Sequence, residues 1–325
     1  SDCIATYYKE EVFSESHWLH IENFLRTAAD HGINMILTPL FTPPLDTAIG
    51  GERPTVQLVD VTKSGGKYSF QFSKLKRWID LCKKCKIKYF EMSHFFTQWG
   101  AKYTPKIIAQ VDGECKRIFG WDVAADSSEY KEFLDAFLPE LVQFLKTEQI
   151  EGYTYFHVSD EPQLADLESY QKAYNLMKPH LKGFKIIDAL SNYEFYRSGA
   201  VEHPIPALNH IQPFLEVDDL WTYYCCSQGV KVSNRFFAMP SYRNRILGLQ
   251  LYQHNITGFL QWGYNFYYSQ CSQRPINPYV VTDADYAFPS GDAFSVYPGD
   301  DGTAIPSLRL KVFLHGLQDI RALQL

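Results

Sequence analysis

Helical and strand-like patterns of apolar residues alternate along the chain. Over residues 17–30, apolar side chains from Trp18 to Leu25 recur at the spacing of an amphipathic helix. Gly32 ends this helix, and the apolar run at residues 33–41 has the length and composition of a buried strand. The pattern therefore predicts a helix that leads directly into a strand.

The same alternation continues to the end of the chain. Further helices are expected at residues 73–85, 129–147, 162–178, 241–255 and 308–323, and further strands at 88–96, 152–159, 184–190, 208–214, 220–226 and 258–264. Residues 55–72 are typical of a β-hairpin that turns at Gly65 and Gly66. Residues 97–127 are too long for a simple loop, which indicates a functional excursion at one rim.

Strands that alternate with helices form parallel βαβ units, and about seven such units fit a closed barrel better than an open sheet. We therefore predict an α/β fold, a (β/α)8 TIM-type barrel that occupies residues 1–325 as a single domain. Because the chain begins with a helix, its first strand is expected to be very short or to lie upstream. No glycine-rich phosphate-binding turn is present, so a nucleotide site of that kind is not expected.

Composition narrows the classes of partner. The formal net charge of −6 does not favour binding to nucleic acid or to an anionic membrane. No apolar run approaches the roughly 18 residues that span a bilayer. Aromatic residues make up 16% of the chain, which suits carbohydrate sites with their aromatic platforms but also an aromatic core.

Seven cysteines, an odd number with Cys225 next to Cys226, do not suggest a disulfide framework. Cys82 and Cys85 have the spacing of zinc ligands, but no second pair follows them, so neither a metal nor another cofactor is expected. Reduced thiols and a beginning unlike a signal peptide predict a cytoplasmic protein.

In a barrel of this type, the chemistry takes place where the strands end, at the carboxyl-terminal face. Polar and aromatic residues at the predicted strand ends are Thr42, Ser93, His94, Asp160, Glu161, Ser191, Asn192, Gln212, Tyr223, Tyr224, Trp262 and Asn265. These side chains are expected to converge on one mouth.

Asp160 and Glu161 form the most informative pair, because a predicted strand runs straight into them. Pro162 pushes Glu161 out of the helical region, so that both acids can reach the mouth. The local sequence alone is equally compatible with a plain helix cap in front of Pro162.

Two adjacent carboxyls disfavour double ionisation, so one of them can donate a proton near neutral pH, as a glycosidase requires. Retaining glycosidases place two carboxyls roughly 5–5.5 Å apart across the sugar, and inverting ones place them farther apart. Neighbours on one loop fit neither arrangement well. They fit a substrate-assisted reaction better, in which the sugar's own 2-acetamido oxygen attacks C1.

At this point a family resemblance can be recognised. Its blocks are FSESHW (13–18), the pair Asp160 and Glu161, WTYYCC (221–226), GFLQWGYN (258–265), VYPG (296–299), SLR (307–309) and GLQD (316–319). In their order and spacing they resemble the catalytic domain of glycoside hydrolase family 123, the β-N-acetylgalactosaminidases and their relatives. The resemblance runs over nearly the whole chain.

The resemblance implies a (β/α)8 barrel and substrate-assisted catalysis, with Asp160 supporting the acetamido group and Glu161 as acid/base. An N-terminal β-sandwich often precedes this domain in the family, and we expect none within these 325 residues. Residues 90–100 differ from the family pattern. The sugar N-acetylgalactosamine is therefore implied by the resemblance alone and not by the residues of this chain.

Further substrate contacts are expected around the mouth. For each of these residues, packing in the core is the alternative. Trp262 could form the floor of the sugar site and Asn265 could bind a hydroxyl. At most one of Tyr223 and Tyr224 is expected to face the mouth. The remaining candidates are His94, Trp99, His157 and Asn192, whereas Arg309 and Asp319 suggest structural ion pairs.

The sequence therefore predicts a retaining exo-β-N-acetylhexosaminidase that acts on a carbohydrate without metal or cofactor. One alternative is a catalytically inactive barrel that binds glycans. Another is a glycosidase for a sugar that has no acetamido group.

Overall fold

The computed structural model describes all residues from 1 to 325. The chain divides into two compact units, described separately below. Unit 1 comprises residues 1–34, 191–193 and 203–325, and unit 2 comprises residues 35–190 and 194–202. None of the helices is long and apolar enough to cross a membrane.

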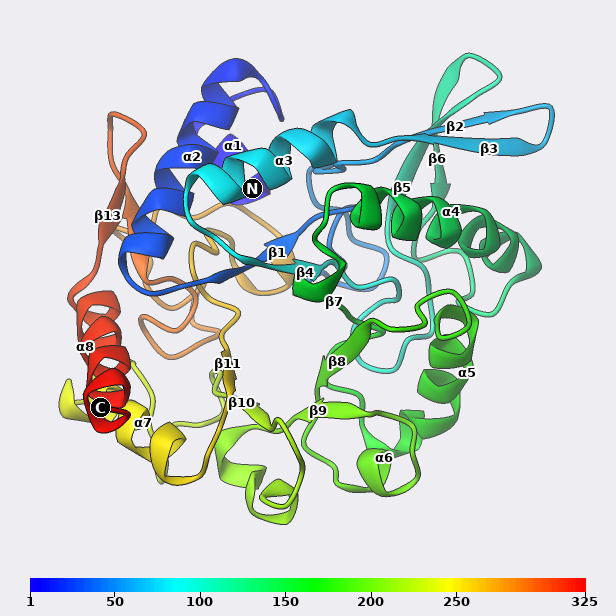
Figure 1. Ribbon diagram of the computed structural model, residues 1–325. Coiled ribbons are helices and arrows are strands. Elements are labelled where there is room, and N and C mark those ends of the chain that lie inside the picture. Colours follow the sequence, from blue (N-terminus) through cyan, green and yellow to red (C-terminus); the bar gives the residue numbers. More distant parts are fainter. The chain divides into compact units, whose positions relative to one another are not determined.

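The centre of unit 2 is a parallel sheet in the order β1, β4, β7, β8 (Figure 1). Its strands are β1 (Met35–Thr38), β4 (Tyr89–Met92), β7 (Thr154–Phe156) and β8 (Lys185–Ala189). Helices α3 (Ser73–Lys84), α4 (Ser128–Thr147) and α5 (Leu167–Met177) connect successive strands, and the short α6 (Glu194–Arg197) follows β8. Because the strands are parallel, their carboxyl ends meet at one edge, where ligand sites form.

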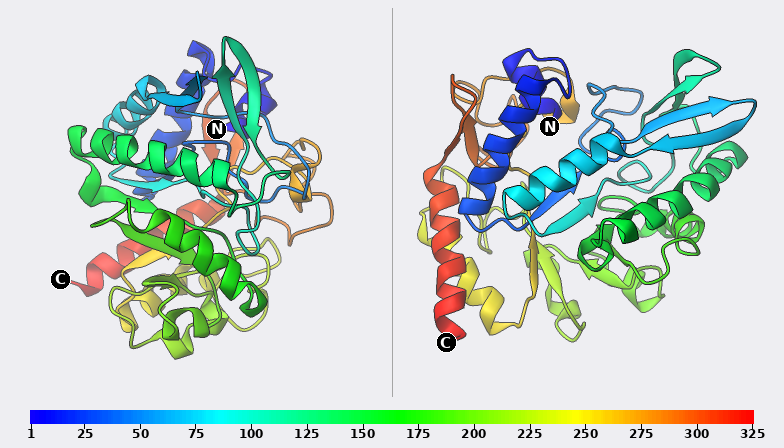
Figure 2. Two further views of the ribbon diagram at one scale, coloured as in Figure 1. Left: turned by 90° about the vertical axis from the view of Figure 1, so that its right-hand side faces the viewer. Right: turned by 45° about the horizontal axis from the view of Figure 1, so that its top comes forward.

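A second sheet of unit 2 has the order β3, β2, β5, β6, and Figure 2 shows its two hairpins side by side. Its strands are β2 (Asp60–Ser64), β3 (Lys67–Gln71), β5 (Ile107–Val111) and β6 (Glu114–Phe119). Helix α4 packs against this sheet through Phe133 and Phe137, whose rings lie 5.7 and 5.0 Å from the ring of Phe70. The hairpin is therefore anchored by an aromatic core.

Unit 1 contains α1 (Asp2–Tyr8), α2 (Glu15–Asp30), α7 (Tyr242–Gln253) and α8 (Leu308–Leu323), with β9 (His203–Ile205), β10 (Trp221–Tyr223), β11 (Gly258–Leu260), β12 (Val296–Pro298) and β13 (Ala304–Pro306). Strands β10 and β11 are parallel, and β12 and β13 are antiparallel. Helices α7 and α8 cross at Gly248 and Gly316. A Cβ atom on Gly248 would lie 2.1 Å from the carbonyl oxygen of Gly316, so this crossing requires glycine.

Most predicted elements are confirmed, including the turn at Gly65 and Gly66 and the helix at 308–323. The strand predicted at 208–214 is wrong: two 3-10 turns occupy Leu208–His210 and Gln212–Phe214. Pro213 has no N–H to donate to a ladder, which explains the turn. The excursion at 97–127, for which no helix or strand was predicted, contains the β5–β6 hairpin.

Candidate active site

The Asp160–Glu161 pair lies just beyond β7, and backbone hydrogen bonds hold it on both sides. Trp99 N donates to Asp160 O at 2.9 Å, from the segment that follows β4. Glu161 N donates to Ala189 O at 3.0 Å, at the end of β8. The Ser159 hydroxyl adds a bond of 2.8 Å to Thr97 O. The pair is therefore fixed to both neighbouring strand ends.

This part of the backbone is strained. Glu161 has φ of 43° and Trp99 has φ of 58°, in the left-handed region that disfavours side chains with a Cβ atom. Such residues cost about 1–3 kcal/mol each and persist where the surroundings hold them, often at functional sites. Pro162, which disfavours the right-handed helical region for Glu161, contributes to this conformation.

Helix capping, the alternative reading of the pair, is performed by other residues. The turn Leu164–Asp166 begins after Gln163, and Gln163 N donates to Asp166 Oδ2 at 3.1 Å. The side chains of Asp160 and Glu161 are both half-buried, so they are accessible to a ligand.

A buried ionic network lies in the same part of unit 2, and His157 is at the centre of this network. Its Nδ1 is 3.0 Å from Asp188 Oδ1, and its Nε2 is 2.8 Å from Glu91 Oε1. Asp188 also accepts hydrogen bonds from Val158 N, at 3.1 Å, and from the Tyr170 hydroxyl. His157, Asp188 and Tyr170 are fully buried, so the network has a fixed geometry.

The charges of this network follow from its contacts. Burial lowers the pKa of His157, but the contacts with Asp188 and Glu91 outweigh it and raise this pKa to about 10. The ring of His94 is stacked on that of His157 with centroids 4.2 Å apart, and burial and the neighbouring charge hold the pKa of His94 well below its usual range. At neutral pH the stack therefore pairs an imidazolium with a neutral imidazole.

Among the carboxyl groups of the site, Asp160 has the most strongly shifted pKa. Burial, and next the charge of Glu161, raise the pKa of Asp160 well above its usual value, while the charge of His157 opposes this rise. The adjacent acids therefore retain a proton where an exposed pair would have lost it. Proton donation near neutral pH is the chemistry that this arrangement can perform.

A metal ion would have three possible ligands here, since ligand atoms of His94, His157 and Asp188 lie within 4.8 Å of one another. Both ring nitrogens of His157 already face carboxylates, and its stacking on His94 turns the ring faces rather than the nitrogens toward each other. The donor set fits an ion-pair network better than a metal centre. Cys82 in α3 and Cys85, which directly follows α3, are both buried.

The structure brings together the predicted residues of unit 2. His94 and His157 belong to the ionic network, and Trp99 bonds to Asp160 through its backbone while its side chain is 46% exposed. Glu91, Asp188 and Tyr170 complete this network but were missed. The available signal was an acid inside an apolar strand, Glu91 in β4 and Asp188 in β8, since such an acid requires a buried partner.

The other predicted residues, Asn192, Tyr223, Tyr224, Trp262 and Asn265, belong to unit 1. Tyr224 is fully buried in a cluster with Leu247 and Leu251, and its hydroxyl donates to Asn244 Oδ1 at 3.3 Å. Tyr224 is thus a core residue, and Tyr223, at 7% exposed, is buried as well.

Trp262 is 36% exposed. The rings of Phe266 and Phe288 pack against its ring in T-shaped arrangements, with ring centroids 5.2 and 5.3 Å away. The Arg235 guanidinium donates to Gln261 Oε1 at 2.8 Å and to the backbone oxygen of Gly263, the two residues on either side of Trp262 in the chain. An exposed indole in a fixed orientation is suited to stack on a sugar ring. The backbone of Asn265 forms an isolated antiparallel β-bridge with Phe294. Asn192 is half-buried.

Comparison with known proteins decides the family. The sequence model of the glycoside hydrolase 123 catalytic domain matches residues 1–325. The chain belongs to glycoside hydrolase family 123. A structure of a family 123 glycoside hydrolase from Clostridium perfringens, described as showing details of glycolipid glycan hydrolysis, is similar with a TM-score of 0.73 at 18% identity. The likeness covers 99% of this chain and 57% of that enzyme.

This likeness confirms the predicted fold class, α/β of the TIM-barrel type. Two further enzymes match less well. A mannosidase from Rhizomucor miehei has a TM-score of 0.46 at 11% identity, over 96% of this chain and 89% of its own. An endo-β-1,4-glucanase from Xanthomonas axonopodis pv. citri has a TM-score of 0.49 at 13% identity, over 91% and 90%. No curated protein matches this family 123 domain in sequence.

Proposed function

We propose that this family 123 domain is a retaining exo-β-N-acetylhexosaminidase that uses substrate-assisted catalysis. The observation that carries the proposal is the Asp160–Glu161 pair, two adjacent carboxyls at a strand end with a raised pKa of Asp160. The mechanism requires one proton donor and one charge-stabilising carboxylate close together, and this pair offers both. The substrate is a carbohydrate that ends in a 2-acetamido sugar.

In the first step, the acetamido carbonyl oxygen attacks C1 and the bond to the leaving oxygen breaks. Glu161 gives its proton to that leaving oxygen, and Asp160 accepts a hydrogen bond from the acetamido N–H. In the second step, Glu161 takes a proton from water, and the water oxygen opens the cyclic intermediate at C1. Two inversions at C1 give net retention of configuration.

Substrate binding is expected to change the charge of Asp160. In the free protein, burial favours a proton on Asp160. A hydrogen bond from the acetamido N–H favours the ionised form of Asp160, because it stabilises the charged carboxylate. Binding of the correct sugar therefore favours the ionised form of Asp160, which is the form that the proposed role requires. A sugar without the acetamido group would leave the proton on Asp160.

The buried His157 supports this change of charge. Its imidazolium charge favours the ionised form of Asp160, whereas the charges of its two counter-ions, Asp188 and Glu91, favour the protonated form. Fixed charges of this kind cost no reorganisation during the reaction. We assign His157 as a positioning residue for the charge state of Asp160.

The test is hydrolysis of aryl β-N-acetylgalactosaminide and aryl β-N-acetylglucosaminide, together with inhibition by a thiazoline analogue of the cyclic intermediate. The proposal predicts turnover with retention of configuration and inhibition by the thiazoline. Turnover of aryl glycosides without an acetamido group, insensitive to the thiazoline, would contradict the acetamido role. Retardation on glycan columns without any turnover would instead support a binding protein.

A further inference from the structure

Residues 97–101, between β4 and β5, form a strained turn that we call the Trp99 turn. Three consecutive residues in it have positive φ: 58° at Trp99, 117° at Gly100 and 55° at Ala101. This region is unfavourable for residues with a Cβ atom, so a run of this kind persists only where the surroundings hold it. The contacts around the Trp99 turn therefore decide its conformation.

The Trp99 turn is bonded to the chain at the acidic pair. Trp99 N donates to Asp160 O at 2.9 Å, and the Ser159 hydroxyl donates to Thr97 O at 2.8 Å. These bonds hold the backbone at Asp160 and one residue before it. A movement of the turn is therefore passed to the backbone that carries the two carboxyls.

The buried carboxylate of Asp166 packs against the same turn. A Cβ atom on Gly100 would lie 2.6 Å from Asp166 Oδ1, so the carboxylate contacts the glycine backbone directly. The Ser169 hydroxyl donates to Gly100 O at 2.6 Å, and Lys102 Nζ lies 3.0 Å from Asp166 Oδ1. The start of α5 and the turn before it thus hold Gly100 in its unusual conformation.

Asp166 is also bonded to the chain that leaves the acidic pair. Its Oδ2 accepts a hydrogen bond from Gln163 N at 3.1 Å, and Gln163 Nε2 donates to Glu161 O at 3.4 Å. Gln163 comes two residues after Glu161. One carboxylate therefore joins the chain just after the pair to the Trp99 turn, which is itself bonded to Asp160.

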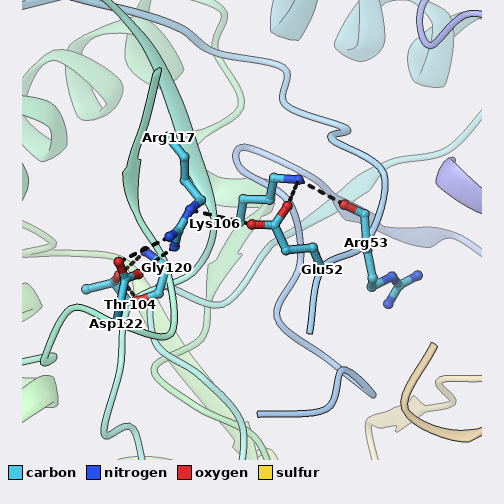
Figure 3. A network of polar contacts seen from close by, with 7 residues as sticks. All are labelled: Glu52, Arg53, Thr104, Lys106, Arg117, Gly120 and Asp122. Carbon is cyan, nitrogen blue, oxygen red and sulfur yellow. Dashed lines mark hydrogen bonds and ion pairs between the residues drawn. The ribbon is translucent and has the colours of Figure 1, made fainter. Parts of the chain in front are cut away.

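The rest of the excursion at 97–127 is held by contacts of its own (Figure 3). The Thr104 hydroxyl donates to Gly120 O at 3.0 Å and accepts from Gly120 N at 2.9 Å, which joins the two segments at the base of the β5–β6 hairpin. Lys106 Nζ donates to Glu52 Oε2 at 2.8 Å and to Arg53 O at 3.2 Å, which holds the hairpin to the loop after β1. A change at residues 97–101 therefore leaves the rest of the excursion in place.

We infer that Asp166 is a positioning residue for the acidic pair, because it completes a closed series of contacts from Asp160 through the Trp99 turn and back to Glu161. This role rests on the proposed function and deepens it, since it names what holds the two carboxyls in place for proton transfer. The shape of Asp166 and its acceptor oxygens perform the role. Its charge contributes little, because the side chain of its partner Lys102 is 59% exposed.

The kinetic test measures kcat and KM on an aryl β-N-acetylgalactosaminide. Asp166→Ala is expected to lower kcat about 10- to 100-fold with little change in KM, since a misplacement of about 1 Å costs up to about 10² in rate. Asp166→Asn keeps the shape and an acceptor for Gln163 N, so it should retain most of the activity. The control is Ser127→Ala, which removes a helix cap of α4, the bond of 3.3 Å from Tyr130 N, and should leave kcat unchanged.

Gly100→Ala tests the same contact without changing Asp166. The added Cβ atom, 2.6 Å from Asp166 Oδ1, would push the turn and the carboxylate apart. Its loss of kcat should resemble that of Asp166→Ala, and the two losses should not multiply in the double variant, because both remove one contact. Losses that multiply would overturn the positioning role. So would an unchanged kcat in Asp166→Ala, or an equal loss in Asp166→Asn or in Ser127→Ala.

A spectroscopic measurement separates this role from the proposed function. In protein labelled with 5-fluorotryptophan, the fluorine resonance of Trp99 is assigned by its absence in Trp99→Phe. It should shift or broaden in Asp166→Ala and stay unchanged in Asp166→Asn and Ser127→Ala. If the wild type shows no turnover, a resonance that moves only in Asp166→Ala would support the contact between Asp166 and the Trp99 turn while the hydrolase proposal fails. A resonance that does not move in Asp166→Ala would overturn the role of Asp166 whatever the turnover.

Discussion

Asp188→Asn tests whether the buried network around His157 is an ion-pair system. The change keeps the shape of the side chain and an oxygen that can accept from Val158 N and the Tyr170 hydroxyl. It removes one of the two negative charges that face His157. Glu91 remains as the second counter-ion, so only part of the stabilisation of charged His157 is lost.

The magnitude follows from the pKa of His157 and from general costs of buried ion pairs. An increase from 6.5 to about 10 corresponds to roughly 4–5 kcal/mol of stability at 1.36 kcal/mol per pH unit. Because the folded-state pKa is the higher one, this stability is fully present below pH 6.5 and is lost as the pH rises through about 10. Removing one partner of a buried pair costs about 3–5 kcal/mol, and with Glu91 retained we expect about 2–3 kcal/mol at pH 7.

Urea unfolding of the wild type and Asp188→Asn between pH 6.5 and pH 10 is the assay. The free energy of unfolding of the variant should be lower at pH 6.5 and should fall less steeply as the pH rises, so that the two curves converge near about pH 10. Asp135→Asn removes an exposed partner of Lys131 and His180 and serves as the control, with a cost of about 0–1 kcal/mol. Equal stability of Asp188→Asn and wild type at pH 6.5 would refute the network's ionic character.

Two further predictions concern the acidic pair. Glu161→Gln should fold normally and lose far more activity on glycosides with poor leaving groups than on activated aryl glycosides, because a good leaving group needs little protonation; equal losses, measured as kcat/KM across a leaving-group series, would argue against Glu161 as the acid. Asp160→Asn should keep its melting temperature but lose about 10²–10³ in kcat, the cost of one electrostatic contact to the transition state. Azide should not restore this activity, and an unchanged kcat would remove Asp160 from the mechanism.

The sequence was sufficient to predict the βαβ alternation, because buried strands and amphipathic helices leave clear periodicities. Helix α8 begins and ends at the predicted residues, Leu308 and Leu323. The β5–β6 hairpin was missed because most of β6 is exposed and polar, so it has no apolar alternation. Its pairing with β2 is a long-range contact that no local pattern reports.

Prediction of the site was limited in the same way. Asp160 and Glu161 were recognisable because they follow a strand and precede Pro162. The partners of His157 were not, since Glu91 and Asp188 come from two other strands and only the fold brings them to its two ring nitrogens. Tyr224 shows the converse: its position after a strand suggested the mouth, while its packing against Leu247 and Leu251 places it in the core.

The participation of the acetamido group, on which the proposed function rests, is tested most directly by stepwise fluorination of the substrate's N-acetyl methyl group. Each fluorine makes the carbonyl oxygen a weaker nucleophile while the sugar and leaving group stay the same. The account predicts that kcat/KM on aryl β-N-acetylgalactosaminides falls steeply from the acetyl to the trifluoroacetyl compound. A value of kcat/KM that does not change along the series would show that the acetamido oxygen does not attack C1, and would contradict the roles assigned to Asp160 and Glu161.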